Sequence, residues 1–393
     1  MTNTDPSNQP VILAARRTVV GRFLGGLSRI PSPEIGSWAI KAAVEDSGVN
    51  PGEIDECVMG CVLQAGVGQN PARQAGLKAG LPSTLSAVTV NKVCGSGLQA
   101  VMQAATSIKA GETNTVVAGG MENMSISPHL ANVRNGIKFG EGKLIDHMQH
   151  DGLTCAFEGW GMGSAAEWTA EEFNISREAQ DAYAAQSHQR AAIAISEGWF
   201  DSEQITLEAS QVKQRADVTQ DEGVRDDSTP EMLGKLRPAF AKEGTVTAGN
   251  ASQISDGGAA VVVASPNTNG EVLARIVDYN TQGVDPKEIF TAPGKGVAAL
   301  LKRNELSVSD IDLFEINEAF AVQVLQNLEH LGLDQNNVNI CGGGVALGHP
   351  IGASGARVLV TLVHQMKRVD AKRGIVSLCL GGGNAVSMLI ERD

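Results

Sequence analysis

The segment LSAVTVNKVCGSGLQAVMQAATSIKAG, residues 85–111, decides the architecture of the chain. Its first part, 85–90, is an apolar run rich in β-branched residues, which predicts a strand, and the glycine-rich CGSG at 94–97 follows it. Apolar residues then recur at helical spacing until Gly111, where a helix should end. This order of strand, turn and helix is typical of an α/β fold, and it places Cys94 at the predicted junction.

A second copy of this plan lies near the C-terminus. Residues 338–340 lead into the glycine-rich CGGGVALGHPIGASG and a second predicted helix, and a strand is expected over 374–391. The likeness extends upstream, where PGEIDECVMGCV at 51–62 matches VSDIDLFEINEAF at 308–320. Two such halves at nearly constant spacing predict an internally duplicated α/β core, with a chance likeness of common α/β elements as the alternative.

Residues 125–251 differ from both halves in composition and in their pattern of apolar residues. They contain a strongly helical stretch, Ser176–Gly198, with Ser176 as its N-cap, and a polar, charged run at 211–231. Apolar, β-branched sequence resumes at AAVVVAS, 259–265, as if the chain had returned to complete the first half. We therefore predict an N-terminal half at 1–124 plus 252–272, an inserted loop domain at 125–251 and a C-terminal half at 273–393.

The charge of the chain restricts its partners. A formal net charge of -13 and a pI near 5.1 argue against nucleic acid or an anionic membrane as the main partner. An anionic ligand would need a local basic patch, which Arg134, Lys138 and Lys143 could supply, although a solvated surface loop fits these charges equally well. No apolar run approaches the roughly 18 residues of a membrane span, so we expect no membrane segment.

The opening and the cysteines indicate the compartment. The opening, MTNTDPSNQP, has no secretory features, so we expect a cytoplasmic protein. The six cysteines show no C-x-x-C pair, and we expect free thiols. His147, His150 and Cys155 have a loosely metal-like spacing, but no second ligand pair follows, so we expect no metal site.

Cys94 is the candidate nucleophile. A thiol at a helix N-terminus meets the positive end of the helix dipole and free backbone N–H groups, which should lower its pKa and favour the thiolate. A buried structural cysteine is the alternative. His349 lies at the equivalent junction of the second half, and Cys379 ends that half's last strand. In a duplicated core the junctions face each other, and one base plus a second thiol favours a Claisen condensation over hydrolysis.

Five motifs occur together, in one order, over nearly the whole chain: NKVCGSG (91–97), VTAGNAS (246–252), NEAF (317–320), GHPIGASG (348–355) and CLGGGN (379–384). This combination resembles the thiolases, which are coenzyme A-dependent acyltransferases. The resemblance implies a duplicated α-β-α-β-α layered core with an inserted loop domain. It also implies acetyl-CoA, acetoacetyl-CoA and coenzyme A as reactants, no cofactor, and a homodimer or homotetramer with 125–143 as a candidate tetramer contact.

The resemblance implies roles for individual residues. Cys94 would take the acyl group, His349 would activate it, and Cys379 would remove or return the α-proton. Asn317 would fix a water that stabilises the enolate oxygen together with the His349 ring, and the N–H groups of Cys94 and Gly381 would form a second oxyanion hole. In the channel for coenzyme A and its pantetheine arm, Arg225 would lie at the nucleotide end and Ser252 beside a pantetheine amide. The residues that would line this channel are Leu153, Met162, Arg225, Phe240, Ala248, Ser252 and Phe320.

The length of the acyl chain is harder to predict. Acetoacetyl-type thiolases usually carry histidine before the methionine, where this chain has Gly161. Residues 151–163 favour a short-chain enzyme, whereas 218–225 and 252–258 favour longer chains. We predict reversible condensation of two acetyl-CoA to acetoacetyl-CoA, with degradation of longer 3-ketoacyl-CoA as the alternative. A β-ketoacyl synthase, which would need a second histidine in place of Cys379, and an inactive thiolase-fold binding protein are the remaining alternatives.

Overall fold

A computed structural model describes residues 9–393, so nearly all of the polar opening that suggested a cytoplasmic protein lies outside the described residues. The first repeat contains the helices α1 (Ser32–Ser47), α2 (Pro71–Lys78) and α3 (Ser96–Ala110) and the strands β1 (Val11–Thr18), β3 (Glu56–Gly60), β4 (Ser86–Val90), β5 (Thr115–Asn123) and β9 (Ser255–Ala264). In this repeat β3 is parallel to β4 and β5, β5 is antiparallel to β9, and β9 is antiparallel to β1.

The second repeat follows the same pairing. It contains the helices α8 (Ala292–Arg303), α9 (Ala321–Leu331) and α11 (Ile351–Val369) and the strands β10 (Ala274–Gly283), β11 (Leu313–Ile316), β12 (Arg373–Leu380) and β13 (Asn384–Glu391). Here β11 is parallel to β12, β12 is antiparallel to β13, and β13 is antiparallel to β10. A short antiparallel contact between β1 and β10 joins the two repeats.

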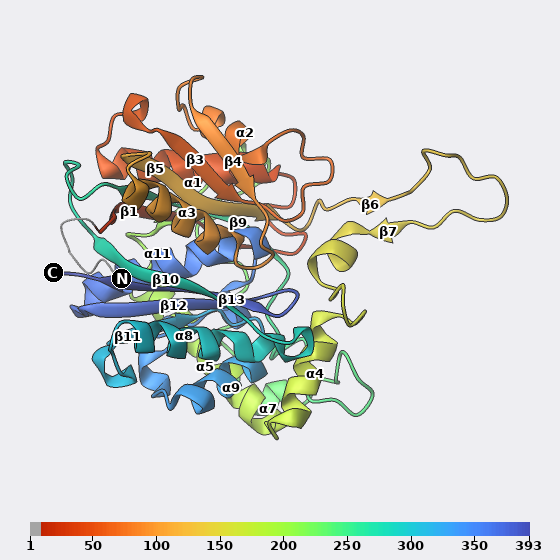
Figure 1. Ribbon diagram of the computed structural model, residues 1–393. Coiled ribbons are helices and arrows are strands. Elements are labelled where there is room, and N and C mark those ends of the chain that lie inside the picture. Colours follow the sequence, from red (N-terminus) through yellow and green to blue (C-terminus); the bar gives the residue numbers. More distant parts are fainter. Residues whose placement is uncertain (1–8) are drawn as a thin grey trace.

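Helices and sheets alternate through the molecule in layers (Figure 1). The helices α1 and α2 cover the outer face of the first sheet, and α8 and α9 cover the outer face of the second. Between the sheets lie α3 and α11, and α11 packs against α3, β5, β9 and β12. The predicted α/β fold with a duplicated α-β-α-β-α core is therefore confirmed.

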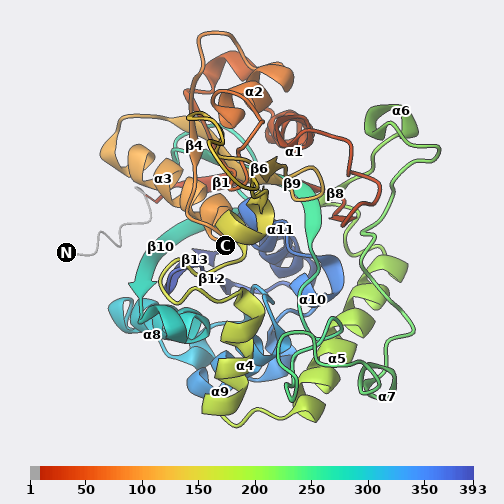
Figure 2. The same ribbon diagram turned by 90° about the vertical axis from the view of Figure 1, so that its right-hand side faces the viewer.

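The segment between β5 and β9 is mainly helical and irregular. Its elements are β6 (His129–Leu130), β7 (Ile145–Asp146), a π-helical turn (Met148–Gly152), α4 (Met162–Glu172), α5 (Arg177–Ser196), β8 (Gln204–Ile205), α6 (Ala209–Val212) and α7 (Pro230–Leu233). The hairpin β6–β7 projects from the body (Figure 1), and α4, α5 and α7 lie beside the second repeat (Figure 2). The exact domain limits stay a prediction. Within residues 9–393, no helix has the length and apolarity needed to span a membrane.

Two expected strands differ from the structure. Residues 338–340 form no strand, because Val338 makes only an isolated parallel bridge to Phe314. A short helix, α10 (Gly344–Leu347), occupies the segment before α11 instead. The expected strand over 374–391 is a hairpin of β12 and β13, which turns at Gly382 and Gly383, both with φ of 85°. Such positive φ values are open to glycine at little cost.

Glycines at the start of α3 and α11 let the two central helices touch. A Cβ atom on Gly97 would lie 2.7 Å from the backbone nitrogen of Ala356, and one on Gly355 would lie 2.4 Å from that of Leu98. Only glycine fits at these contacts. The glycines of CGSG and GHPIGASG therefore serve helix–helix packing, and they bring the junctions that precede α3 and α11 to one place.

Candidate active site

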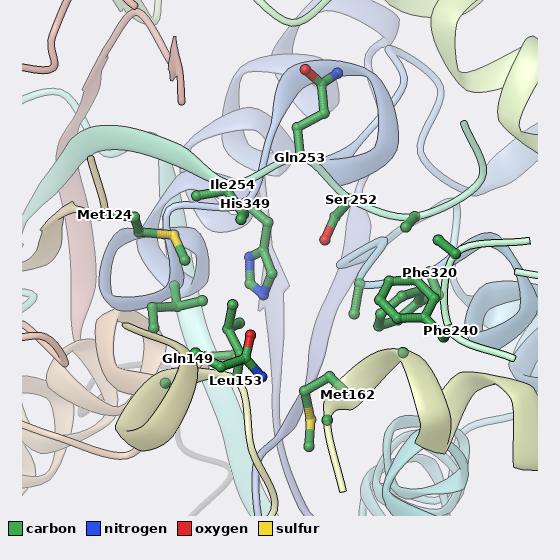
Figure 3. Close-up of a pocket in the computed structure, with 18 of the residues that line it drawn as sticks. Met124, Gln149, Leu153, Met162, Phe240, Ser252, Gln253, Ile254, Phe320 and His349 are labelled. Carbon is green, nitrogen blue, oxygen red and sulfur yellow. The ribbon is translucent and has the colours of Figure 1, made fainter. Parts of the chain in front are cut away.

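A cavity of about 630 Å³ lies where the two junctions meet, and Cys94, His349 and Cys379 all line it. Figure 3 shows the His349 ring between two groups of side chains. Met124 and Ile254 lie on one side of the ring, and Phe240 and Phe320 lie on the other. The three residues predicted to carry the chemistry are thus brought together from distant parts of the chain.

A strained turn presents Cys94. Val93 has a φ of 47°, which is rare for a β-branched residue. The Ser96 hydroxyl accepts a hydrogen bond from the Lys92 N–H at 2.8 Å and donates one to the Val93 carbonyl at 2.6 Å, which closes the turn. Gly95 leaves room for Leu380, since a Cβ there would lie 2.2 Å from that side chain. Such strain is often stored where a side chain must be aimed at a site.

The pKa of Cys94 contradicts the expectation from its helix position. Burial raises the pKa of the thiol to about 12, although the backbone N–H groups of Cys94 and Gly381 act to lower it. Desolvation outweighs the helix N-terminus because the sulfur packs against the apolar core of both repeats, although Cys94 as a whole residue is only partly buried and lines the cavity. The resting nucleophile is therefore a neutral thiol that needs a base.

His349 meets the requirements of that base. Its Nδ1 lies 2.6 Å from the Ser354 hydroxyl, which itself donates to the Pro350 carbonyl at 2.9 Å. Because the Ser354 hydroxyl proton is used in that bond, its oxygen can only accept a hydrogen bond from the His349 ring. We therefore assign the ring proton to Nδ1 from this network. Nε2 is buried, has no hydrogen-bond partner among residues 9–393 and carries the free lone pair. Burial, with a smaller contribution from Arg357, lowers the pKa of His349 to about 3, so the ring is neutral.

Asn317 lies beside this histidine but outside the cavity wall. It follows β11, is 1% exposed, and its Nδ2 lies 3.5 Å from His349 Nδ1. Its Oδ1 is buried with no hydrogen-bond partner among the described residues. That oxygen is an acceptor available to a water, and the role of Asn317 in holding one stays a prediction.

Cys379 and Gly381 approach Cys94 from the second repeat. Burial, followed by the charge of Cys94, raises the pKa of Cys379 well above its usual value. The Gly381 N–H acts on the Cys94 sulfur, and Gly383 needs its glycine because a Cβ there would lie 2.7 Å from the Val284 carbonyl oxygen. Two protonated thiols and two backbone donors therefore share one corner of the cavity.

Most of the predicted coenzyme A channel lines the same cavity: Leu153, Met162, Phe240, Ala248, Ser252 and Phe320. Phe240 meets Phe320 edge to face at 6.2 Å between ring centroids, and a Cβ on Gly163 would clash with the Phe240 ring. Arg225 does not line the cavity, and its backbone N–H donates to His188 Nδ1 at 3.1 Å. The structure thus brings together all the predicted channel residues except Arg225.

Two buried residues were not predicted. Ser354 fixes the His349 tautomer, and its place five residues after the histidine in GHPIGASG was the available signal. The Glu122 carboxylate accepts the N–H groups of Val62, Leu63 and Gly352, so it ties the loop after β3 to the first turn of α11. Burial raises the pKa of Glu122 to about 7. A single acidic residue after a glycine-ended strand gave no comparable signal.

The other sequence candidates lie away from this chemistry. Arg134, Lys138 and Lys143 belong to the projecting hairpin and do not line the cavity. His147 and His150 each hold Asp151 through Nδ1 at 2.6 Å, and no group of three metal-ligating side chains occurs within residues 9–393. The cysteines are free, and five of them are buried.

Comparison with known proteins gives a consistent result over the whole chain. The family models "Thiolase, N-terminal domain" and "Thiolase, C-terminal domain" match residues 10–267 and 270–392. An acetyl-CoA acetyltransferase of Cupriavidus necator is 50% identical over 97% of this chain and 99% of its own length. The crystal structure of the Bacillus anthracis acetyl-CoA acetyltransferase superposes with a TM-score of 0.94 at 41% identity, covering 98% of this chain and 99% of that one. The Ascaris suum Acat5 thiolase, in complex with coenzyme A, gives 0.93 at 40% identity and covers 98% and 100%.

Proposed function

Because this chain belongs to the thiolase family, we propose that it is an acetyl-CoA C-acetyltransferase, which condenses two acetyl-CoA to acetoacetyl-CoA and coenzyme A and catalyses the reverse thiolysis. The observation that carries the proposal is the convergence of Cys94, His349 and Cys379 on one cavity, where Nε2 of His349 has no hydrogen-bond partner among the residues that the structure describes. The proposed reaction needs no cofactor, because the two thiols and the imidazole supply its proton transfers.

The first half-reaction acylates Cys94. His349 Nε2 takes the proton of the thiol while the sulfur attacks the thioester carbonyl, so that a new C–S bond forms on Cys94 and the bond to coenzyme A breaks. The proton leaves with the coenzyme A thiol. Since Cys94 and His349 are both neutral at pH 7, proton transfer accompanies the attack and no thiolate forms beforehand.

The second half-reaction forms the carbon–carbon bond. Cys379 first passes its own proton to His349 Nε2, and the resulting thiolate removes a proton from the methyl group of a second acetyl-CoA. The carbanion attacks the acetyl carbonyl on Cys94, and the C–S bond to Cys94 breaks. Cys379 keeps the methyl proton, and the Cys94 sulfur takes back the proton held by His349. The N–H groups of Cys94 and Gly381 would stabilise the oxyanion of the tetrahedral intermediate, while protonated His349 and a water held by Asn317 would stabilise the enolate.

A longer acyl chain is the second candidate substrate, and the space around Gly161 favours it. A Cβ at Gly161 would have only Gln149 Nε2 at 3.7 Å and the Leu153 carbonyl at 3.8 Å within contact distance. No side chain fills this part of the wall, so it can admit added methylenes, each contributing about 0.8 kcal/mol when buried.

Self-association is part of the proposal. The projecting hairpin exposes large apolar side chains, with Phe139 fully exposed and Leu144 and Ile137 more than half exposed. Exposed apolar surface of this kind marks protein contacts. This supports a homodimer or homotetramer in which 125–143 contributes, and sedimentation of a variant with Phe139→Ser should show a smaller assembly. The cytoplasmic location stays a prediction.

Turnover assays test the function directly. The protein should thiolyse acetoacetyl-CoA faster than a six- to ten-carbon 3-ketoacyl-CoA, and Cys94→Ser should abolish turnover of both. A Cys94→Ser protein with nearly wild-type turnover would refute the mechanism. A wild-type optimum at six carbons or more would instead refute the short-chain assignment and retain the thiolase chemistry.

A further inference from the structure

Arg22 is the only formally charged side chain among the described residues that line the substrate cavity. The rest of the wall is apolar or neutral. His349 and the thiols are uncharged at neutral pH, since burial lowers the pKa of the imidazole and raises those of Cys94 and Cys379. A permanent cation in such a wall determines which ligand groups can lie beside it.

The backbone around Arg22 is firmly held. Arg22 ends β2 (Gly21–Arg22), which pairs with β9 opposite Ser255. The carboxylate of Glu222 accepts the N–H groups of Arg22 at 3.0 Å and Gly26 at 2.9 Å, and Ser125 accepts the N–H of Leu24 at 2.8 Å. The loop is therefore fixed by hydrogen bonds that leave the Arg22 side chain free.

The guanidinium itself is uncommitted. Within residues 9–393 it forms no hydrogen bond or ion pair, since the nearby Glu222 carboxylate is used by backbone N–H groups. Phe23, which is 42% exposed, lines the cavity beside it. Arg22 is exposed and lines the cavity, so it lies at the side of the cavity that is open to solvent, while Ser252, Gln253 and Ile254, just before β9, line the cavity as well.

We propose that Arg22 is an anion-binding residue of this cavity, whose guanidinium pairs with a negatively charged oxygen group of the thioester substrate. Two parts of such a substrate carry this chemistry: the phosphates of coenzyme A, and a carboxylate at the far end of an acyl chain. A guanidinium binds either group with two parallel hydrogen bonds. In a chain of net charge -13, a local cation is also needed to offset repulsion of an anionic ligand. The proposal rests on the proposed function.

The test compares Arg22→Gln with a matched control, Arg29→Gln. Arg29 is exposed, lies in the same segment and does not line the cavity. Each protein is assayed with acetoacetyl-CoA and acetoacetyl-pantetheine, and with six-carbon 3-ketoacyl-CoA esters with and without a terminal carboxylate. The first pair of substrates differs in the phosphates of coenzyme A, and the second pair differs in the terminal carboxylate. In at least one pair, Arg22→Gln should raise the KM of the substrate that carries the extra anionic group about tenfold, which corresponds to about 1.4 kcal/mol. kcat should change less than twofold, and the control should match the wild type.

The two comparisons separate the sources of the anion. A rise with acetoacetyl-CoA but not with acetoacetyl-pantetheine assigns Arg22 to a phosphate, and a rise confined to the carboxylated ester assigns it to the acyl end. If Arg22→Gln changed KM equally for the two substrates of each pair, or did not change KM at all, the proposal would be overturned.

Calorimetric binding of free coenzyme A and pantetheine needs no turnover. If the wild type were inactive on all four esters, the proposed function would fail. Arg22 would then be judged by binding alone: weaker binding of coenzyme A but not of pantetheine by Arg22→Gln would support it, and unchanged binding of both would overturn it.

Discussion

The two strand-to-helix junctions occupy equivalent places in the repeats but have different surroundings. In the first repeat a full strand, β4, leads to Cys94 through a turn strained at Val93. In the second repeat the strand is reduced to the bridge at Val338, and His349 is 7% exposed at the start of α11. The first junction therefore positions the Cys94 side chain at the cavity, whereas the second holds the His349 ring in one protonation state.

The difference lies in the partners of the two reactive groups. His349 has Ser354 as a hydrogen-bond acceptor at 2.6 Å, whereas Cys94 is influenced mainly by burial and by backbone N–H groups. Burial moves the pKa of the thiol up to about 12 and that of the imidazole down to about 3, so both groups are neutral. Reactivity then comes from placing a donor and an acceptor together, and not from ionising either one in advance.

Removing the base should have the largest effect. His349→Gln keeps a side chain of similar size but lacks the basic Nε2, so acetylation of Cys94 should slow by about 10³ to 10⁴, the upper range of general-base contributions. Rapid-quench measurement of the acyl-enzyme checks this. A loss of less than tenfold would mean that Cys94 obtains its proton acceptor elsewhere.

Removing the partner of the base should have an intermediate effect. Ser354→Ala deletes the acceptor of the Nδ1 proton, so the tautomer with a free Nε2 is no longer favoured, and kcat should fall about tenfold to a hundredfold with little change in KM. Gln99, five residues after Cys94 as Ser354 is after His349, supplies the matched control. Gln99→Ala should lower kcat less than twofold, and equal losses in both variants would make Ser354 merely structural.

Filling the space at Gly161 should have a smaller effect, restricted to long chains. Gly161→His should lower kcat/KM for six- to ten-carbon 3-ketoacyl-CoA several-fold, because the ring would occupy room that added methylenes need at about 0.8 kcal/mol each. Activity on acetoacetyl-CoA should change little. An unchanged chain-length profile would show that Gly161 does not set the pocket.

The smallest effect is expected in the pH profile of Cys94 acetylation, which should lack the acid limb that a histidine with an ordinary pKa would produce. His349 stays neutral above its pKa of about 3 and Cys94 stays protonated below its pKa of about 12, so neither group should give the rate of Cys94 acetylation a limb between about pH 5 and 9. Rates of single-turnover acetylation across that range provide the measurement. An acid limb near pH 6.5, the ordinary pKa of histidine, would contradict the assigned burial of His349.

The sequence predicted those features that depend on local pattern. Residues 85–111 form the expected strand and helix, ending at Gly111 with a φ of 75°, and the motifs located Cys94, His349 and Cys379. Local pattern could not show that 338–340 lacks a paired strand, because pairing depends on neighbours distant in sequence.

The pKa of Cys94 was wrongly expected to be low for a similar reason. The helix N-terminus is visible in the sequence, whereas the burial that outweighs it arises only when residues of both repeats pack into one core around Cys94. That the Arg22 guanidinium has no partner within residues 9–393 was equally hidden, because it depends on Glu222, which is far away in the sequence.

The most direct test is to identify the acetylated residue in a Cys379→Ser protein mixed with acetyl-CoA. The variant retains Cys94 and His349, so mass spectrometry should find one acetyl group on the peptide that contains Cys94. The same protein should lose most of its condensation activity, because the group that removes the α-proton is gone. Acetylation at another residue, or equal loss of acetylation and condensation, would contradict the division of labour between the two thiols.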